Sequence, residues 1–140
     1  MRYLSIDYGL KRTGLAICDK GEMIVSPLAV IDSRKGLIEK IIKIIKNENV
    51  EAIVVGLPLN MDDSKGSQAQ LSEKFAERLK KEIQIPLYLQ DERLSSFAAE
   101  EKLAPAQYTR GKKKKRLDAI AAAEILNFFL QQKSSDNQVE

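Results

Sequence analysis

The chain of 140 residues contains no histidine, and this absence removes two common kinds of active site. Histidine is the usual general base near neutral pH, so acid–base chemistry here would need another group. The common zinc sites are also excluded, because they take histidine and cysteine ligands and the chain has one cysteine. Any metal ion must therefore be held by oxygen ligands, which favours Mg²⁺ or Mn²⁺.

Cysteine, long apolar runs and aromatic residues are also scarce. The single Cys18 cannot form an internal disulfide, and we expect it as a small buried side chain in a protein of the reducing cytoplasm. There is no apolar run that could cross a bilayer and no basic-then-apolar leader, so no membrane association is expected. Only Tyr8 and Tyr108 look available for stacking bases, which argues against a module that reads single strands.

The residues that are present are typical of one globular domain. Hydrophobic residues make up 44% and charged residues 31% of the chain, whose length is sufficient for one core. We predict a single domain over residues 1–132 and a disordered tail over residues 133–140. The net charge of +3 permits a polyanionic partner without requiring one, so the placement of the charges matters more.

Hydrophobic patterning divides the first part of the chain into strands and one helix. Three short apolar segments predict an antiparallel meander over residues 2–7, 13–18 and 23–30. A helix is expected over residues 34–47, where an isoleucine stripe follows a cap from Asp32 or Ser33. The continuous apolar run at 52–57 predicts a strand that is buried on both faces and hence parallel to its neighbour.

The second part alternates helices with one more strand. The expected segments are a loop over 58–66, a helix from Ser67, a strand over 85–89, a helix from Ser95 to about Pro105, irregular chain over 106–116 and a helix over 117–131. Ser67 and Gln70 have capping-box spacing, and Pro86 favours an edge strand. Together these segments predict an α/β fold with a mixed five-stranded sheet, three antiparallel strands followed by parallel strands, flanked by helices.

Three acids lie at the ends of predicted elements. Asp7 ends the first strand, Glu92 follows the last strand, and Asp118 lies in the first turn of the last helix. In open α/β sheets, sites form outside the carboxyl ends of the strands. Converging carboxylates repel one another unless a cation neutralises them, so such a cluster would hold one or two divalent metal ions for phosphodiester hydrolysis.

Each acid also has an ordinary structural explanation. Asp7 could simply end a strand, Glu92 could be a solvated loop charge, and Asp118 could complement the helix dipole. Asp91 is adjacent to Glu92, but successive residues of an extended chain point to opposite sides, so it is a poor additional ligand. The spacing of the acids alone leaves these alternatives open.

Basic and amide side chains accompany the acids. A block of five cations precedes Asp118 and consists of Lys112, Lys113, Lys114, Lys115 and Arg116. Lys11, Arg12 and Arg93 each neighbour a proposed ligand and could contact flanking phosphates, and Asn60 could bind a phosphate or sugar. The alternative is that the basic block is a solvated loop and that Asn60 only stabilises its own turn.

Four segments of the chain resemble the signature blocks of the YqgF family, also known as the "putative pre-16S rRNA nuclease" or "putative Holliday junction resolvase" family. They are Ile6-Asp7-Tyr8-Gly9-Leu10-Lys11-Arg12-Thr13-Gly14, Val55-Gly56-Leu57-Pro58-Leu59-Asn60, Asp91-Glu92-Arg93-Leu94-Ser95-Ser96 and Leu117-Asp118-Ala119-Ile120-Ala121-Ala122. The blocks occur in the family's order and cover residues 1 to about 130. The first and third blocks are the most specific.

The resemblance implies a ribonuclease H-like fold and metal-dependent phosphodiester cleavage. It also implies that Asp7, Glu92 and Asp118 are the catalytic and metal-binding residues. Junction resolvases of this fold use four carboxylates, and three can be matched here, which weakens the junction-cutting interpretation.

The leading hypothesis is thus a cytoplasmic Mg²⁺- or Mn²⁺-dependent endonuclease that acts on structured RNA during maturation of the pre-16S rRNA end. The preference for RNA comes from the resemblance alone. We expect association with ribosome precursors and a monomer or weak homodimer. The alternatives are a Holliday junction resolvase on branched DNA, a non-catalytic RNA-binding or transcription-linked factor, and, last, an actin-like phosphotransferase, for which the chain is too short.

Overall fold

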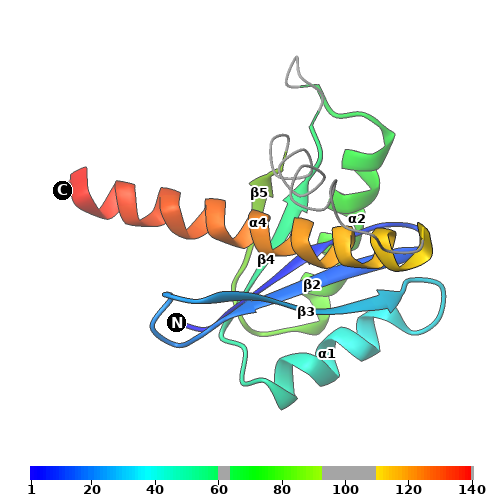
Figure 1. Ribbon diagram of the computed structural model, residues 1–140, viewed down its shortest axis with the longest axis horizontal. Coiled ribbons are helices and arrows are strands. Elements are labelled where there is room, and N and C mark those ends of the chain that lie inside the picture. The colour runs from blue at the N-terminus through cyan, green and yellow to red at the C-terminus, as the bar shows by residue number, and fades with distance from the viewer. Residues whose placement is uncertain (60–63, 93–109, 140) are drawn as a thin grey trace.

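The computed structural model describes residues 1–59, 64–92 and 110–139, and of residues 110–117 and 136–139 it describes only their place in a helix (Figure 1). In this part of the chain the elements are β1 (Tyr3–Asp7), β2 (Arg12–Cys18), β3 (Val25–Asp32), α1 (Leu37–Asn47), β4 (Ala52–Leu57), α2 (Ser67–Glu82), β5 (Leu87–Asp91) and α4 (Arg110–Val139). The expected helix between Ser95 and Pro105 lies outside the described residues.

The five strands form one mixed sheet in the order β3-β2-β1-β4-β5. The meander β1, β2 and β3 is antiparallel, whereas β4 runs parallel to both β1 and β5. This confirms the predicted five-stranded α/β architecture. β5 spans Leu87–Asp91, two residues later than predicted, and it is an edge strand as Pro86 indicated.

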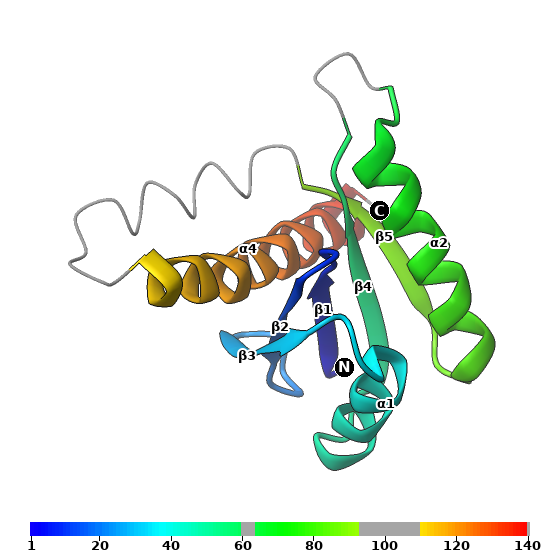
Figure 2. The same ribbon diagram turned by 90° about the vertical axis from the view of Figure 1, so that its right-hand side faces the viewer.

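Helices cover the two faces of the sheet (Figure 2). α1 and α2 lie on one face, where Leu4 and Ile6 of β1 pack with Ile41 and Phe75 in the larger core cluster. α4 crosses the opposite face, where Ser5 donates a hydrogen bond of 2.6 Å to the carbonyl of Ala122. Alternate residues of β1 therefore face different layers, and the residues at positions 3, 5 and 7 share the α4 side.

The sheet register brings the ends of the central strands together. Ile6 is opposite Val55, and on the other side of β4 Leu57 is opposite Asp91. β1, β4 and β5 are parallel, so Asp7 and the residue after β5 lie at the same carboxyl edge of the sheet. Cys18 is buried on β2 as a free thiol, as predicted.

α1 begins three residues later than the sequence predicts, and neither Asp32 nor Ser33 caps it. Its N-cap is Gly36, which has φ 59° and no side-chain capping bond. β3 extends to Asp32, opposite Arg12, and the Ser33 amide donates to the carbonyl of Lys11 at 2.9 Å. The two expected cap residues are thus used by the sheet instead.

The predicted capping box at the start of α2 is also wrong. Gly66 is the N-cap and no side chain caps the helix. Gln68, the second residue of α2, instead donates a hydrogen bond of 3.1 Å from its side-chain Nε2 to the carbonyl of Tyr8. The start of α2 therefore fixes the turn that follows β1 rather than its own first amide groups.

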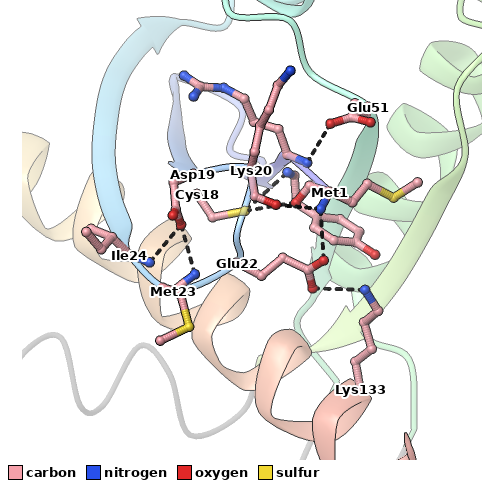
Figure 3. A network of polar contacts seen from close by, with 11 residues as sticks. Met1, Cys18, Asp19, Lys20, Glu22, Met23, Ile24, Glu51 and Lys133 are labelled. Carbon is pink, nitrogen blue, oxygen red and sulfur yellow. Dashed lines mark hydrogen bonds and ion pairs between the residues drawn. The ribbon is translucent and has the colours of Figure 1, made fainter.

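α4 is longer than predicted at both ends. It begins at Arg110, within the segment expected to be irregular, and continues to Val139, through the expected tail (Figure 1). Lys133 anchors this extension, because its Nζ lies 2.9 Å from Oε1 of Glu22 and 5.1 Å from the ring centroid of Tyr3. Figure 3 shows Glu22 between Lys133 and the amino group of Met1, which lies 2.9 Å from Oε2.

Within the described ranges, none of the helices combines the length and apolar character that a membrane span requires.

Candidate active site

Asp7 and Glu92 form a buried acid pair at the carboxyl edge of the sheet. Asp7 is the last residue of β1, and Glu92 directly follows β5. The Glu92 amide donates to the carbonyl of Leu57 at 3.3 Å, and Glu92 as a whole residue is only 7% exposed. The carboxyl groups of Asp7 and Glu92 share a hydrogen bond, so two sequence segments separated by more than half the chain meet at one point.

Burial and mutual repulsion raise the pKa of both acids. For Asp7, burial is the larger cause of the raised pKa and the negative charge of Asp118 adds to it. For Glu92, burial again comes first in raising the pKa, followed by the charge of Asp7 and its hydrogen bond. A buried carboxylate pair that resists double ionisation is arranged to share either a proton or a cation.

Asp118 lies beside this pair but has a cation of the chain as its partner. Its Oδ2 accepts a hydrogen bond of 3.0 Å from Nε of Arg12, the first residue of β2. α4 comes so close to the sheet here that a Cβ on Gly14 would collide with the backbone carbonyl of Asp118. Gly14 thus permits the approach that places Asp118 near Asp7.

Gly56 makes room for the carboxyl group of Glu92. A Cβ at this position of β4 would collide with Oε2 of Glu92 and with Cδ1 of Ile125. In the described part of the chain, this buried Oε2 has no hydrogen-bond partner. An unpartnered carboxyl oxygen in a tight cradle is costly unless a further group binds it.

The donor set fits a hard divalent cation. Among the described residues, no group of three or more histidine, cysteine or acidic side chains already has an arrangement that could hold a metal ion. The acid pair of Asp7 and Glu92 nevertheless offers oxygen ligands, one of which is the unpartnered Oε2 of Glu92. The raised pKa values of both acids show that their negative charges are not neutralised by other groups at this position. A cation such as Mg²⁺ or Mn²⁺ would offset the repulsion between the two carboxylates and would give Oε2 of Glu92 the partner that it lacks.

Only some of the nucleic-acid-binding residues predicted from the sequence lie in the described part of the structure. Lys11 and Arg12 lie in the turn after β1 and at the start of β2, next to the acids. The basic block 112–116 lies in the first turns of α4, ahead of Asp118, and its side chains are outside the described structure. Asn60 and Arg93 are also outside the described residues.

Sequence reasoning missed the role of Gly14. A glycine inside a strand signals a close backbone approach, and this signal was present in the first block of the chain. The second block contains a glycine of the same kind, because Gly56 near the end of β4 accommodates the carboxyl group of Glu92.

Comparisons with known proteins match almost the whole length of the chain. The family model described as "RuvX: Holliday junction resolvase" matches residues 1–132. A protein of Maridesulfovibrio salexigens named "Putative pre-16S rRNA nuclease" is 41% identical over 132 residues, which cover 93% of this chain and 98% of that protein. A protein of the same name from Geobacillus thermodenitrificans is 40% identical over 137 residues, covering 95% of this chain and 99% of the relative.

Solved structures share the fold at low sequence identity. Thermus thermophilus RuvC superposes with a TM-score of 0.57 at 15% identity, covering 95% of this chain and 97% of RuvC. The fowlpox virus Holliday junction resolvase also gives a TM-score of 0.57 at 15% identity, covering 95% and 99% of the two chains. The fold is thus the ribonuclease H-like fold of these resolvases, and the near full-length family match confirms the resemblance to YqgF proteins: the chain belongs to the RuvX Holliday junction resolvase family.

Proposed function

We propose that this protein is a divalent-metal-dependent endonuclease that hydrolyses phosphodiester bonds in structured RNA and matures the pre-16S rRNA end. Family membership and the names of the curated relatives support the nuclease class. The observation that carries the metal-dependent chemistry is the buried pair Asp7 and Glu92, whose raised pKa values mark a place prepared for a cation.

In this mechanism Asp7 and Glu92 would hold the cation, and Asp118 would join them once its carboxylate leaves Arg12. The cation, when bound, supplies activation of the attacking water and charge stabilisation at the scissile phosphate. Arg12, which is half-buried beside Asp118, is placed to contact a phosphate oxygen when it leaves that carboxylate. Activation of the water by the cation would need no histidine as general base, which agrees with a chain that has no histidine.

Cleavage of an RNA that contains the precursor 16S end tests this function. Purified protein with Mg²⁺ should cut the RNA, and Asp7→Asn should reduce cleavage to the level without protein. Glu77→Gln is the matched control, since Glu77 is an exposed acid within α2, and it should cleave like the wild type. Cleavage that survives Asp7→Asn would contradict the assignment of the site.

A four-way DNA junction is the second candidate substrate, favoured by the description of the family model. The structural relative RuvC has also been solved "in complex with Holliday junction substrate". Symmetric cuts in such a junction would require two active sites and hence a dimer, whereas we propose a monomer or weak homodimer. The junction assay and gel filtration distinguish the two substrates, and metal-independent binding without turnover would favour a non-catalytic RNA-binding factor.

We also propose that the enzyme works in the cytoplasm on ribosome precursors. The free, buried Cys18 is compatible with that compartment. Co-sedimentation of the protein with precursor 30S particles would test the association.

A further inference from the structure

Two hollows lie on either side of Arg34, close to the candidate active site. The first has a volume of about 310 Å³ and lies between the start of β2 and the end of β3. The second has a volume of about 380 Å³ and lies between the turn after β1, the start of α1 and α2. Arg34 lines both, so the two hollows adjoin at this side chain.

Cations outnumber acids along these hollows. The basic residues that line them are Lys11, Arg12, Arg34 and Arg78, and the acidic residues are Asp32 and Glu39. Lys11 and Arg78 are exposed, and the side chain of Arg34 is 69% exposed. A concave surface with an excess of accessible cations attracts a polyanion, and its shape holds one strand better than a flat basic face would.

The turn between β1 and β2 connects the hollows rigidly to the acid pair. Tyr8 directly follows Asp7 and lines the second hollow, where its ring stacks on Phe75 with centroids 4.5 Å apart. Gln68 holds the carbonyl of Tyr8, and Ser33 holds the carbonyl of Lys11 at 2.9 Å. The backbone from which the Lys11 side chain extends is therefore fixed relative to Asp7.

Asp32 fixes the guanidinium group of Arg34 between the two hollows. Nε and Nη2 of Arg34 donate to the two carboxylate oxygens at 3.0 Å and 2.7 Å. A guanidinium carries five N–H groups, and this pairing uses two of them while it holds the plane of the group. Arg34 is thus pre-organised to donate further hydrogen bonds to a phosphate at a reduced cost in side-chain entropy.

We propose that Lys11, Arg34 and Arg78 form a track for the phosphate backbone of the substrate strand as it leaves the acid pair. The strand passes over the turn between β1 and β2, crosses Arg34 and enters the hollow between α1 and α2. Arg34 and Arg78 are positioning residues that contact phosphates and read no base. This inference rests on the proposed function only in taking nucleic acid as the ligand.

The test measures binding rather than cleavage. In the Asp7→Asn background, a fluorescently labelled RNA with the precursor 16S end is titrated between 50 and 300 mM KCl, without divalent metal. Adding Arg34→Ala and Arg78→Ala should weaken binding about 10-fold at physiological salt. The slope of log K against log salt should decrease in magnitude by roughly 1.4–1.8, as expected for the loss of two phosphate contacts.

The matched control adds Lys43→Ala and Lys80→Ala, which remove the same charge from exposed positions of α1 and α2 outside the hollows. This control should bind like the Asp7→Asn parent. Arg34→Lys should keep most of the salt slope and still weaken binding, because the amine lacks the planar group that Asp32 fixes. Circular dichroism and thermal melts check that every variant folds.

Equal slopes for the double arginine variant and the lysine control would overturn the track. That result would leave the nuclease function intact, because the wild-type protein could still cleave RNA. Conversely, the salt slope could change as expected while the wild-type protein never cleaves RNA. That combination would support the track and contradict the proposed catalysis.

Discussion

Nε of Arg12 lies 3.0 Å from Oδ2 of Asp118, so a cation of the protein itself neutralises the third acid of the candidate site. Both side chains are about one third exposed, at 35% and 29%, so the pair is accessible and can exchange partners. Arg12 would therefore compete with a metal ion for Asp118. A phosphate that attracts Arg12 would free the carboxylate for the metal, which would couple substrate binding to completion of the site.

Arg12→Ala should tighten metal binding and weaken nucleic acid binding. Removing the competing guanidinium leaves Asp118 free to join Asp7 and Glu92, and we expect the Kd for Mn²⁺ to fall by about 1.4- to 5-fold, the range of a weak ion pair. Titration of Mn²⁺ followed by electron paramagnetic resonance gives this value without any cleavage assay. Arg2→Ala, which removes a cation paired with Glu48 elsewhere, should leave Mn²⁺ binding unchanged, and an unchanged Kd in Arg12→Ala would show that the pair does not compete.

Asp7→Asn should stabilise the metal-free protein at alkaline pH. The pKa values of Asp7 and Glu92 are raised in the folded state, so the folded protein holds protons that the unfolded chain releases above about pH 4. The wild type in EDTA should thus lose stability as pH rises above that value, until both acids are ionised in the folded state. Asp7→Asn removes one charge of the pair and should gain on the order of 1–2 kcal/mol at pH 8, with a smaller gain at pH 5.

Thermal melts at the two pH values measure this difference. The gain corresponds to a rise in Tm of roughly 3–7 °C at pH 8 for a domain of this size. Adding Mg²⁺ should stabilise the wild type more than the variant, because the cation would neutralise the two repelling carboxylates that only the wild type has. A variant that is less stable than the wild type at pH 8 would mean that the two carboxyl groups do not repel each other.

Gly56→Ala should disable the site. The new Cβ would meet Oε2 of Glu92 and Cδ1 of Ile125, so either the carboxyl group or α4 must move. We expect a loss of about 1–3 kcal/mol in stability, typical of overpacking, together with loss of Mn²⁺ binding. Gly21→Ala is the control, since the nearest atom to its Cβ is a side-chain oxygen of Asp19 at 3.3 Å in an exposed turn, and wild-type Mn²⁺ binding in Gly56→Ala would refute the cradle.

Much of the fold could be predicted from periodicity. The apolar run at 52–57 indicated a doubly buried parallel strand, and the structure places it between β1 and β5. The helix starts were predicted less well because capping depends on what else the cap residue contacts. Asp32 has a side chain suited to capping a helix. Its backbone instead pairs with Arg12 in the sheet, and its carboxylate accepts a hydrogen bond from Arg34.

The sequence by itself determined that any metal site must use oxygen ligands, because the chain has no histidine and a single cysteine. It also placed Asp7 and Glu92 at the ends of their strands, whereas Asp118, expected in the first turn of the last helix, lies inside α4, which begins at Arg110. Only the tertiary structure decided that Asp7 and Glu92 share a buried hydrogen bond while Asp118 pairs with Arg12. The physical reason is that strand ends follow from local patterning, whereas the partner of a carboxylate depends on strand register, on the space beside Gly14 and Gly56, and on the nearest cation.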